Sequence, residues 1–228
     1  MLQGVGVAPF KSTSEWLPSI LEQQHMMGTT IMAVEFDGGV VLGADSRTTT
    51  GAYIANRVSD KITPLAERIY CCRSGSAADT QAISDYVRYY LSIHELDLDD
   101  WPLVKTAASI CRELCYSNKD RLLAGMICAG WDPHYGGQVY TIPLGGTMVR
   151  QPYSIGGSGS TYIYGFCDAH FQKGMSREQC IEFTKKAIAL AMTRDGSSGG
   201  VIRLVVVEES GVSREMIAGQ DLPSISAE

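Results

Sequence analysis

The sequence predicts an α+β fold in which two β-sheets pack face to face and helices cover the outer face of each sheet. The predicted strands are apolar at nearly every position, which is typical of strands that are covered on both faces. The predicted elements follow the order strands, two helices, strands, two helices, strands. No internal repeat or linker divides the 228 residues. A single layered domain accounts for these observations.

The first two strands form a predicted hairpin. They cover 30–36 and 40–45, and the Asp37-Gly38 pair between them is typical of a tight turn. Short apolar runs predict the other strands. These lie at 53–57, 68–73, 125–131, 138–143, 201–208 and 214–218.

Helical patterns fall between the groups of strands. A capping-box pattern at 76–79 opens a run with apolar residues at helical spacing, and Asp100 as N-cap with Pro102 in the first turn opens a second. A short helix is expected at 162–171. A further capping box begins the last helix, expected at 176–194.

Composition excludes several classes of protein. The formal net charge is -6 and no run of Lys or Arg occurs, so the electrostatic footprint of nucleic-acid or anionic-membrane binding is missing. The apolar runs are far shorter than the roughly 20 residues that span a bilayer. The 7 cysteines form no Cys-x-x-Cys pair and the 4 histidines are scattered, so we expect core thiols in a reducing compartment, no metal and no cofactor.

Residues 1–28 differ from the rest of the chain. They mix Gly, Pro, Ser and Gln without a period, and Lys11 is their only basic residue. They therefore resemble neither a secretory signal nor a transit peptide. Because an excellent strand begins directly after Gly28, we predict a separate leader at 1–28 and one domain at 29–228.

Thr29 would become a new N-terminus if the leader were removed. A free α-amine has a pKa of about 7.7–8.0, so it can accept the proton of the Thr29 hydroxyl as that oxygen attacks a carbonyl. One residue would then serve as both nucleophile and base. Its β-branched side chain restricts χ1, which would hold Oγ1 in one direction. The alternative is that Thr29 and Thr30 are ordinary strand residues.

Asp45 and Lys61 are candidates for supporting such a nucleophile. Asp45 closes the second arm of the hairpin and Lys61 follows within a short segment, close to the strand that begins at Thr29. A buried ammonium would favour an unprotonated amine and stabilise a developing alkoxide. The alternative is a structural salt bridge.

Gly75 is a candidate oxyanion donor, because it joins a strand end to a capped helix, where backbone amides point outward. Its alternative is a plain strand-to-helix turn. Two Gly/Ser clusters, at 156–160 and 195–200, lie at helix boundaries and could be ordinary caps.

These features follow one another along the chain as Gly28-Thr29-Thr30, Gly43-Ala44-Asp45-Ser46-Arg47, Lys61, Ser74-Gly75-Ser76, Gly157-Ser158-Gly159-Ser160 and Asp195-x-x-Ser198-Gly199-Gly200. In this order they closely resemble the catalytic beta subunits of the proteasome core, and the resemblance spans essentially the whole chain after Gly28. It implies an N-terminal nucleophile hydrolase with a four-layer αββα sandwich, in agreement with the layering predicted above.

The resemblance also implies a role for each site residue. Thr29 would be nucleophile and base after autolytic cleavage between Gly28 and Thr29, and Asp45 and Lys61 would form the supporting pair. Gly75 would donate the oxyanion hydrogen bond. The residues around the Thr29 amine would be Ser158, Asp195 and Ser198.

The stretch at 72–81 resembles the beta subunit that cleaves after acidic residues, called caspase-like. Arg73 at the base of the pocket would pair with an Asp or Glu carboxylate and repel basic residues. The alternative is a solvated surface arginine. By the same resemblance, Thr48, Thr49 and Ala77 would contact an extended substrate.

The sequence therefore predicts a threonine endopeptidase that needs no cofactor. The resemblance implies stacked heteroheptameric rings of alpha and beta subunits, indirect contact with regulatory particles and assembly chaperones, unfolded or ubiquitin-targeted protein substrates, and a location in cytoplasm and nucleus. Two alternatives remain open. One is an N-terminal nucleophile amidase acting on small amides, and the other is a catalytically silent ring subunit.

Overall fold

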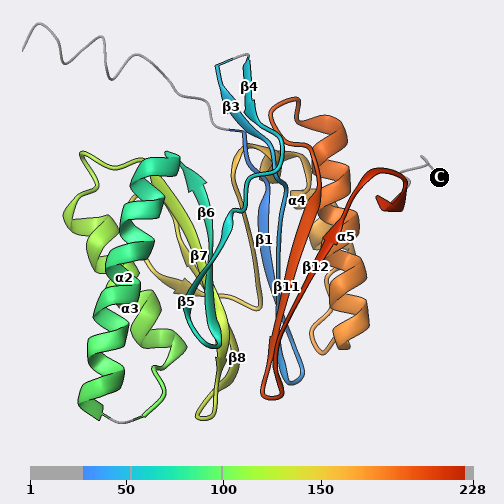
Figure 1. The fold of residues 1–228 in the computed structure, drawn as a ribbon. Helices are drawn as coiled ribbons and strands as arrows, with labels where there is room; N and C mark the ends of the chain where they lie inside the picture. The colour runs from blue at the N-terminus through green and yellow to red at the C-terminus, as the bar shows by residue number, and fades with distance from the viewer. Residues whose placement is uncertain (1–27, 52, 99, 224–228) are drawn as a thin grey trace, which may run out of the picture.

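The computed structural model describes residues 28–51, 53–98 and 100–223. It confirms the predicted four layers (Figure 1). Helices α2 and α3 form one outer layer, helices α4 and α5 form the other, and two β-sheets lie between them. The predicted leader lies outside the described residues except for Gly28. Among the described residues, no helix combines the length and apolar character needed to cross a membrane.

The first sheet has five strands in the order β10-β1-β2-β11-β12, all antiparallel to their neighbours. The predicted hairpin forms its centre, and Gly38 takes the positive φ of 104° that the turn requires. The strands of this sheet are β1 (Ile31–Phe36), β2 (Gly39–Ala44), β10 (Tyr153–Gly156), β11 (Ile202–Glu208) and β12 (Gly211–Ile217).

The second sheet also has five antiparallel strands, in the order β5-β6-β7-β8-β9. A two-stranded ribbon, β3 (Thr48–Thr50) with β4 (Tyr53–Asn56), projects from one end of the sandwich (Figure 1). The strands of the second sheet are β5 (Ile62–Ala66), β6 (Ile69–Gly75), β7 (Ala124–Asp132), β8 (Gly136–Ile142) and β9 (Val149–Arg150).

Strands β3, β5, β9 and β10 were not among the strand predictions. β3 and β9 have three and two residues, too short to show a period. β5 carries Pro64, which disfavours a strand assignment but is tolerated here because β5 is an edge strand. Their pairing partners, not their own sequences, define them.

The helices are α2 (Ala77–Leu98), α3 (Val104–Ser117), α4 (Tyr164–His170) and α5 (Arg177–Arg194), with short 3₁₀ turns η2 (Ser158–Tyr162) and η3 (Gly219–Asp221). The expected helix at 162–171 therefore consists of the end of η2 followed by α4. The capping box at Ser176 is confirmed, with side chain and backbone bonded in both directions.

Two other helix starts differ from the predictions. Ser76 Oγ accepts from Asp79 N, but the Asp79 carboxylate accepts from Leu123 N, so only half of that capping box forms. The prediction of Asp100 as N-cap is wrong, because α3 begins after Leu103. The orphan amide of Val104 donates instead to the Asp132 carboxylate, at 3.0 Å, from the end of β7.

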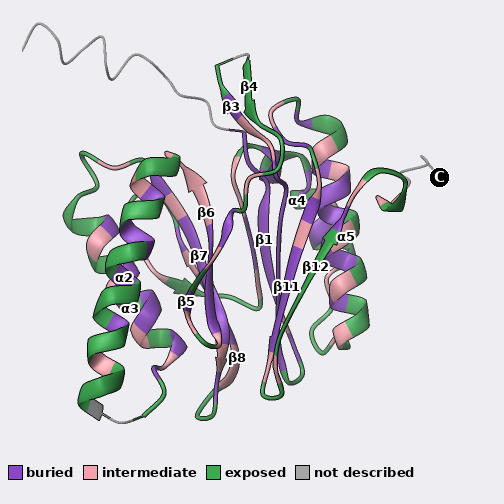
Figure 2. Cartoon of the chain, viewed as in Figure 1, coloured by how far each residue is buried: buried purple, intermediate pink, exposed green. Residues whose placement is uncertain are grey.

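Three apolar clusters hold the layers together. One packs the first sheet against α4 and α5, another packs the second sheet against α2 and α3, and a third fills the space between the sheets. Figure 2 shows buried residues along the strands and on the inward faces of the helices. All cysteines are buried free thiols, as predicted, and burial raises the pKa of Cys71 to about 11.

Candidate active site

Thr29 lies immediately before β1, at the end of the sandwich where the ribbon projects, and only 4% of it is exposed. Its backbone N donates to Ser158 Oγ at 3.1 Å, and its hydroxyl donates to Gly28 O at 2.7 Å. The hydroxyl of the predicted nucleophile thus lies against the carbonyl group of the predicted cleavage site.

Asp45 and Lys61 form the predicted pair beside Thr29. The hairpin register brings Asp45 next to Thr30, whose amide donates to Asp45 Oδ1 at 2.9 Å. Lys61 Nζ donates to Asp45 Oδ1 at 2.7 Å and to Gly28 O at 3.1 Å. The ammonium group therefore connects the buried carboxylate to the predicted scissile carbonyl.

Both charges of this pair are buried and fully bonded. Asp45 Oδ2 accepts from the amides of Gly199, at 2.9 Å, and Arg47, at 3.2 Å. Lys61 Nζ also donates to Arg47 O at 2.7 Å. Burial lowers the pKa of Lys61, while the neighbouring Asp45 carboxylate acts to raise it, and the lowering prevails. A buried ion pair is tolerated only with such complete hydrogen bonding.

Ser158, Asp195 and Ser198 form one network on the other side of Thr29. Ser158 Oγ and Ser198 Oγ each donate to Asp195 Oδ2 at 2.7 Å. Burial acts to raise the pKa of Asp195, but the two serine hydroxyls and the amide of Ser197 stabilise the carboxylate, so the pKa lies below its usual value. Asp195 is thus an anion that orients the hydroxyl bonded to Thr29 N.

Gly75 ends β6 with a φ of 99°, and a Cβ at this position would overlap the Leu123 carbonyl oxygen. Only glycine fits this turn. Together with Gly28, Thr29, Lys61 and other residues, Gly75 lines a small cavity of about 60 Å³. The predicted oxyanion donor and the predicted nucleophile therefore share one cavity.

Arg73 lines the same cavity from β6. Its Nη1 donates to Ala77 O and Thr80 Oγ1, both at 3.4 Å, and its Nη2 donates to Asp60 O at 3.3 Å. These are long hydrogen bonds to uncharged oxygens. In the described part of the chain, the buried Arg73 Nε has no hydrogen-bond partner. The weakly bonded Nη1 and Nη2 therefore retain capacity for an anionic ligand in the cavity.

The predicted substrate contacts lie around this cavity. Thr48 and Ala77 are among its lining residues. Thr49 is buried, and its Oγ1 accepts from Gly28 N at 3.0 Å. All residues predicted for the site therefore lie around Thr29 or in the cavity beside it.

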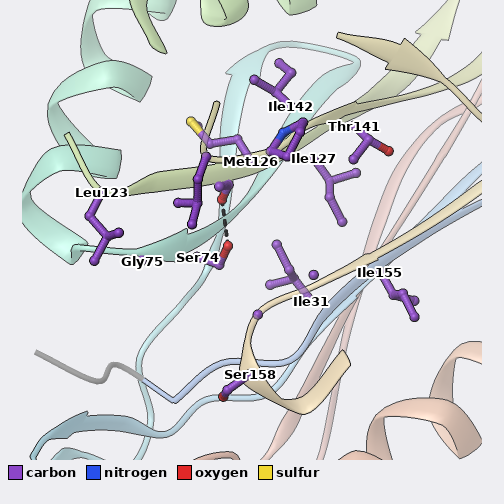
Figure 3. A pocket seen from close by; sticks show the side chains of 15 residues that line it. Ile31, Ser74, Gly75, Leu123, Met126, Ile127, Thr141, Ile142, Ile155 and Ser158 are labelled. Carbon is purple, nitrogen blue, oxygen red and sulfur yellow. Dashed lines mark hydrogen bonds between the residues drawn. The ribbon is translucent and has the colours of Figure 1, made fainter. Parts of the chain in front are cut away.

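A second, larger cavity was missed by the sequence analysis. It has a volume of about 460 Å³, lies between the ends of the two sheets, and shares Gly75 with the smaller cavity. Figure 3 shows Ile31 and Ile127 between the sheets, with Ser158 at one end. The lining is mostly aliphatic. Because its residues come from five separate strands and the segments next to them, no local pattern predicts it.

Gly157 and Gly159 also have functions that local sequence did not assign. Gly157 has a φ of 82°, and a Cβ there would overlap the Thr29 carbonyl oxygen. Gly159 N donates to that oxygen at 3.1 Å. A Cβ on Gly159 would overlap Thr30 Oγ1. The Gly/Ser cluster thus packs its backbone directly against Thr29 and Thr30, which explains why Gly157 and Gly159 lack a side chain.

Within the ranges that the structure describes, no group of three or more His, Cys, Asp or Glu side chains could hold a metal ion. The site chemistry described above is carried by hydroxyl, amine, carboxylate and amide groups of the chain itself.

Comparison with known proteins links this site to one family. The family model described as "Proteasome subunit" matches residues 26–207. The chain is 66% identical over 209 residues to proteasome subunit beta type-6 of Dictyostelium discoideum, covering 92% of this chain and 96% of that protein.

Two other relatives carry different subunit names. Proteasome subunit beta type-1 of Saccharomyces cerevisiae is 58% identical over 188 residues, which cover 82% of this chain and 87% of that protein. Proteasome subunit beta type-9 of Homo sapiens is 56% identical over 196 residues, which cover 86% of this chain and 89% of that protein. Each of these matches covers more than four fifths of this chain.

Proposed function

Because the chain belongs to the proteasome beta-subunit family, whose members assemble in rings with other alpha and beta subunits, we propose that it is a catalytic subunit that cleaves after acidic residues. Its nucleophile is Thr29, freed by removal of the leader at 1–28. The observation that carries this proposal is the contact of Lys61 Nζ with both Asp45 and the Gly28 carbonyl oxygen.

In the proposed reaction, Thr29 Oγ1 attacks the carbonyl carbon of the scissile bond and its proton moves to the free Thr29 amine. The Gly75 amide donates to the oxyanion. When the C–N bond breaks, the leaving nitrogen takes the proton from the Thr29 amine. Water, deprotonated by the same amine, then hydrolyses the Thr29 ester and releases the acid product.

Leader removal uses the same nucleophile on the chain itself. The Thr29 hydroxyl attacks the Gly28 carbonyl carbon, the bond to the Thr29 nitrogen breaks, the hydroxyl proton moves to that nitrogen, and an ester between Gly28 and Thr29 Oγ1 forms. Hydrolysis of that ester releases the leader with a carboxylate at Gly28 and a free amine at Thr29. Lys61, 3.1 Å from Gly28 O, is placed to stabilise the negative charge that develops on that oxygen.

Preference for acidic residues follows from the charges around the smaller cavity. Arg73, Lys61 and Asp60 line it, and the Asp60 carboxylate is paired with Arg214, so a carboxylate is attracted and a basic side chain is repelled. The Nη atoms of Arg73, whose bonds to uncharged oxygens are long, support hydrogen bonds to such a carboxylate.

The leaving side of the substrate lies toward the larger cavity. The Thr29 nitrogen that protonates the leaving amine is bonded to Ser158, and Ser158 lines that cavity. Its aliphatic lining favours an apolar residue after the cleaved bond.

Replacing Thr29 by Ala in the assembled particle tests the proposal. We expect cleavage after Glu to disappear and the mass of this chain to include the leader. The matched variant Thr29→Ser, which keeps a hydroxyl, should retain part of the activity. Activity after Glu that is unchanged in Thr29→Ala would favour the silent ring subunit.

The amidase alternative gives a different outcome. An isolated chain that is active on small amides, as a monomer or dimer in size-exclusion chromatography, would support it and contradict the ring peptidase. For the ring peptidase we also propose the cytoplasm and nucleus as its location, which fluorescence microscopy of a tagged chain would test.

A further inference from the structure

Lys61 is carried by a segment that pairs with the second sheet only at its end, and we call it the lysine segment (58–62). It leads from the β3–β4 ribbon to β5, and Ile62 is its first residue in the second sheet (Figure 1). Ser59 ties it to Ser46 by a backbone bond of 3.0 Å and a hydroxyl bond of 2.7 Å. Arg73 N of β6 donates to Lys61 O at 3.0 Å, whereas residues 58–60, directly before this bond, depend on contacts made outside a sheet.

Two arginines of the first sheet hold this segment on both sides of Lys61. Arg203 of β11 donates from Nη2 to Val58 O at 2.9 Å and from Nε to Ser59 O at 3.2 Å. Arg214 of β12 donates from Nη1 to Asp60 Oδ2 at 3.0 Å and from Nη2 to Ile62 O at 3.2 Å.

Strand register explains why both arginines reach the segment. Arg214 lies directly opposite Val205, and Arg203 is two residues from Val205 along β11. Residues with these relations share one face of a sheet. Val205 packs in the core between the sheets, so both guanidinium groups leave the face that looks toward the second sheet.

We propose that Arg203 and Arg214 are positioning residues that fix Lys61 Nζ against Asp45 and the scissile carbonyl. This inference rests on the proposed function. Arg203 contributes more, because both of its bonds go to backbone carbonyls of the segment, those of Val58 and Ser59. The Arg214–Asp60 pair is about half exposed, with side chains 43% and 42% accessible, so solvent weakens it.

The segment also links this arrangement to the smaller cavity. Asp60 O, between the two sets of arginine contacts, accepts from Arg73 Nη2 at 3.3 Å. Because that bond is long, displacement of the segment should affect Lys61 chemistry more strongly than binding by Arg73.

Arg203→Met in the assembled particle tests this proposal, since methionine removes both hydrogen bonds while keeping an apolar stem. We expect kcat for cleavage after Glu to fall about tenfold, with KM changed less than about twofold, because misplaced groups lower kcat. Arg203→Lys, which can still bond one carbonyl, should recover part of the loss. Arg214→Met should have a smaller effect than Arg203→Met.

The pH profile separates positioning from a general loss of structure. The Lys61 charge lowers the pKa of the free Thr29 amine, so a displaced Lys61 should move the acid limb of kcat/KM to higher pH. Arg177→Met is the matched control, because Arg177 also bonds a residue of β11, Glu208, at a site remote from Thr29. It should leave kcat and the pH profile unchanged.

A structure of the Arg203→Met particle gives a readout that does not depend on activity. Loss of the contact between Lys61 Nζ and Asp45 Oδ1 supports the proposal, and an unchanged contact with unchanged kcat overturns it. If the parent particle does not cleave after Glu, the proposed specificity fails, and the Lys61–Asp45 contact alone then decides on the positioning role.

Discussion

The cavities on the two sides of Thr29 have different linings. On the Lys61 side lies a cavity of about 60 Å³ lined mostly by charged and hydroxyl-bearing residues. On the Ser158 side lies a cavity of about 460 Å³ that is mostly aliphatic. Charged groups act through a few bonds of fixed length, whereas apolar contacts add up over area. We therefore expect single substitutions to cost far more on the first side than on the second.

Lys61→Ala should have the largest effect. It removes the cation next to the scissile carbonyl and leaves Asp45 buried and unpaired, so both leader removal and peptidase activity should fall by about two to three orders of magnitude or more. Intact mass and cleavage of a Glu substrate measure the two effects. A processed, active variant would contradict the role of Lys61.

Gly157→Ala would introduce a side chain on the Ser158 side. This position is an exception on that side, because Gly157 packs against the backbone of Thr29. Its Cβ would overlap Thr29 O and its φ of 82° disfavours alanine, so we expect activity to fall about a hundredfold through displacement of Thr29. Gly196→Ala is the control, since no atom lies within 4 Å of its Cβ position. Equal activity of both variants would show that Thr29 tolerates the shift.

Arg73→Met should lower cleavage after Glu by about thirtyfold relative to cleavage after Leu, because a charge-assisted hydrogen bond is lost and an apolar group takes its place. Leader removal should continue. A panel of peptides that differ only at the residue before the cleaved bond measures the ratio. An unchanged ratio would assign the acidic preference to another residue.

The pH profile of activity should have two limbs, one from the Thr29 amine and one from Lys61. Activity should rise as the Thr29 amine loses its proton and fall, about tenfold per pH unit, as Lys61 loses its own. Because the pKa of Lys61 is lowered by burial, the alkaline limb should lie below the ordinary value of about 10.4.

The variant Asp45→Asn tests whether the alkaline limb reports the pKa of Lys61. The Asp45 carboxylate raises the pKa of Lys61, so its neutralisation should lower that pKa further and move the alkaline limb toward neutral pH. An alkaline limb that stays in place in the particle with Asp45→Asn would assign it to another group.

Leu144→Asn should have the smallest effect. Leu144 lines the larger cavity but is 53% exposed, so cleavage before an apolar residue should fall only about threefold relative to cleavage before Asn. Val149→Asn, at 48% exposure and outside the cavity lining, is the control. Cleavage sites mapped by mass spectrometry in one protein substrate measure both.

Elements with a strong local pattern could be predicted from the sequence. The Asp37-Gly38 turn with two apolar arms, and the reciprocal cap at Ser176, carry their own signals and formed as expected. The prediction of Asp100 as N-cap is wrong because the first amide of α3 is bonded by Asp132, far along the chain. β9 and β10 were not predicted because they are defined by pairing with strands that are distant in the sequence or by very short segments.

The sequence by itself determined the layered fold, the family resemblance and the identity of the chemical groups at the site, since these depend on periodicity and on residue type. Tertiary structure decided which of these groups meet. The Lys61 contacts with Asp45 and Gly28, the larger cavity and the bonds of Arg203 to the lysine segment all join residues that lie far apart in the sequence. Such contacts depend on strand register and sheet packing, which no local stretch of sequence contains.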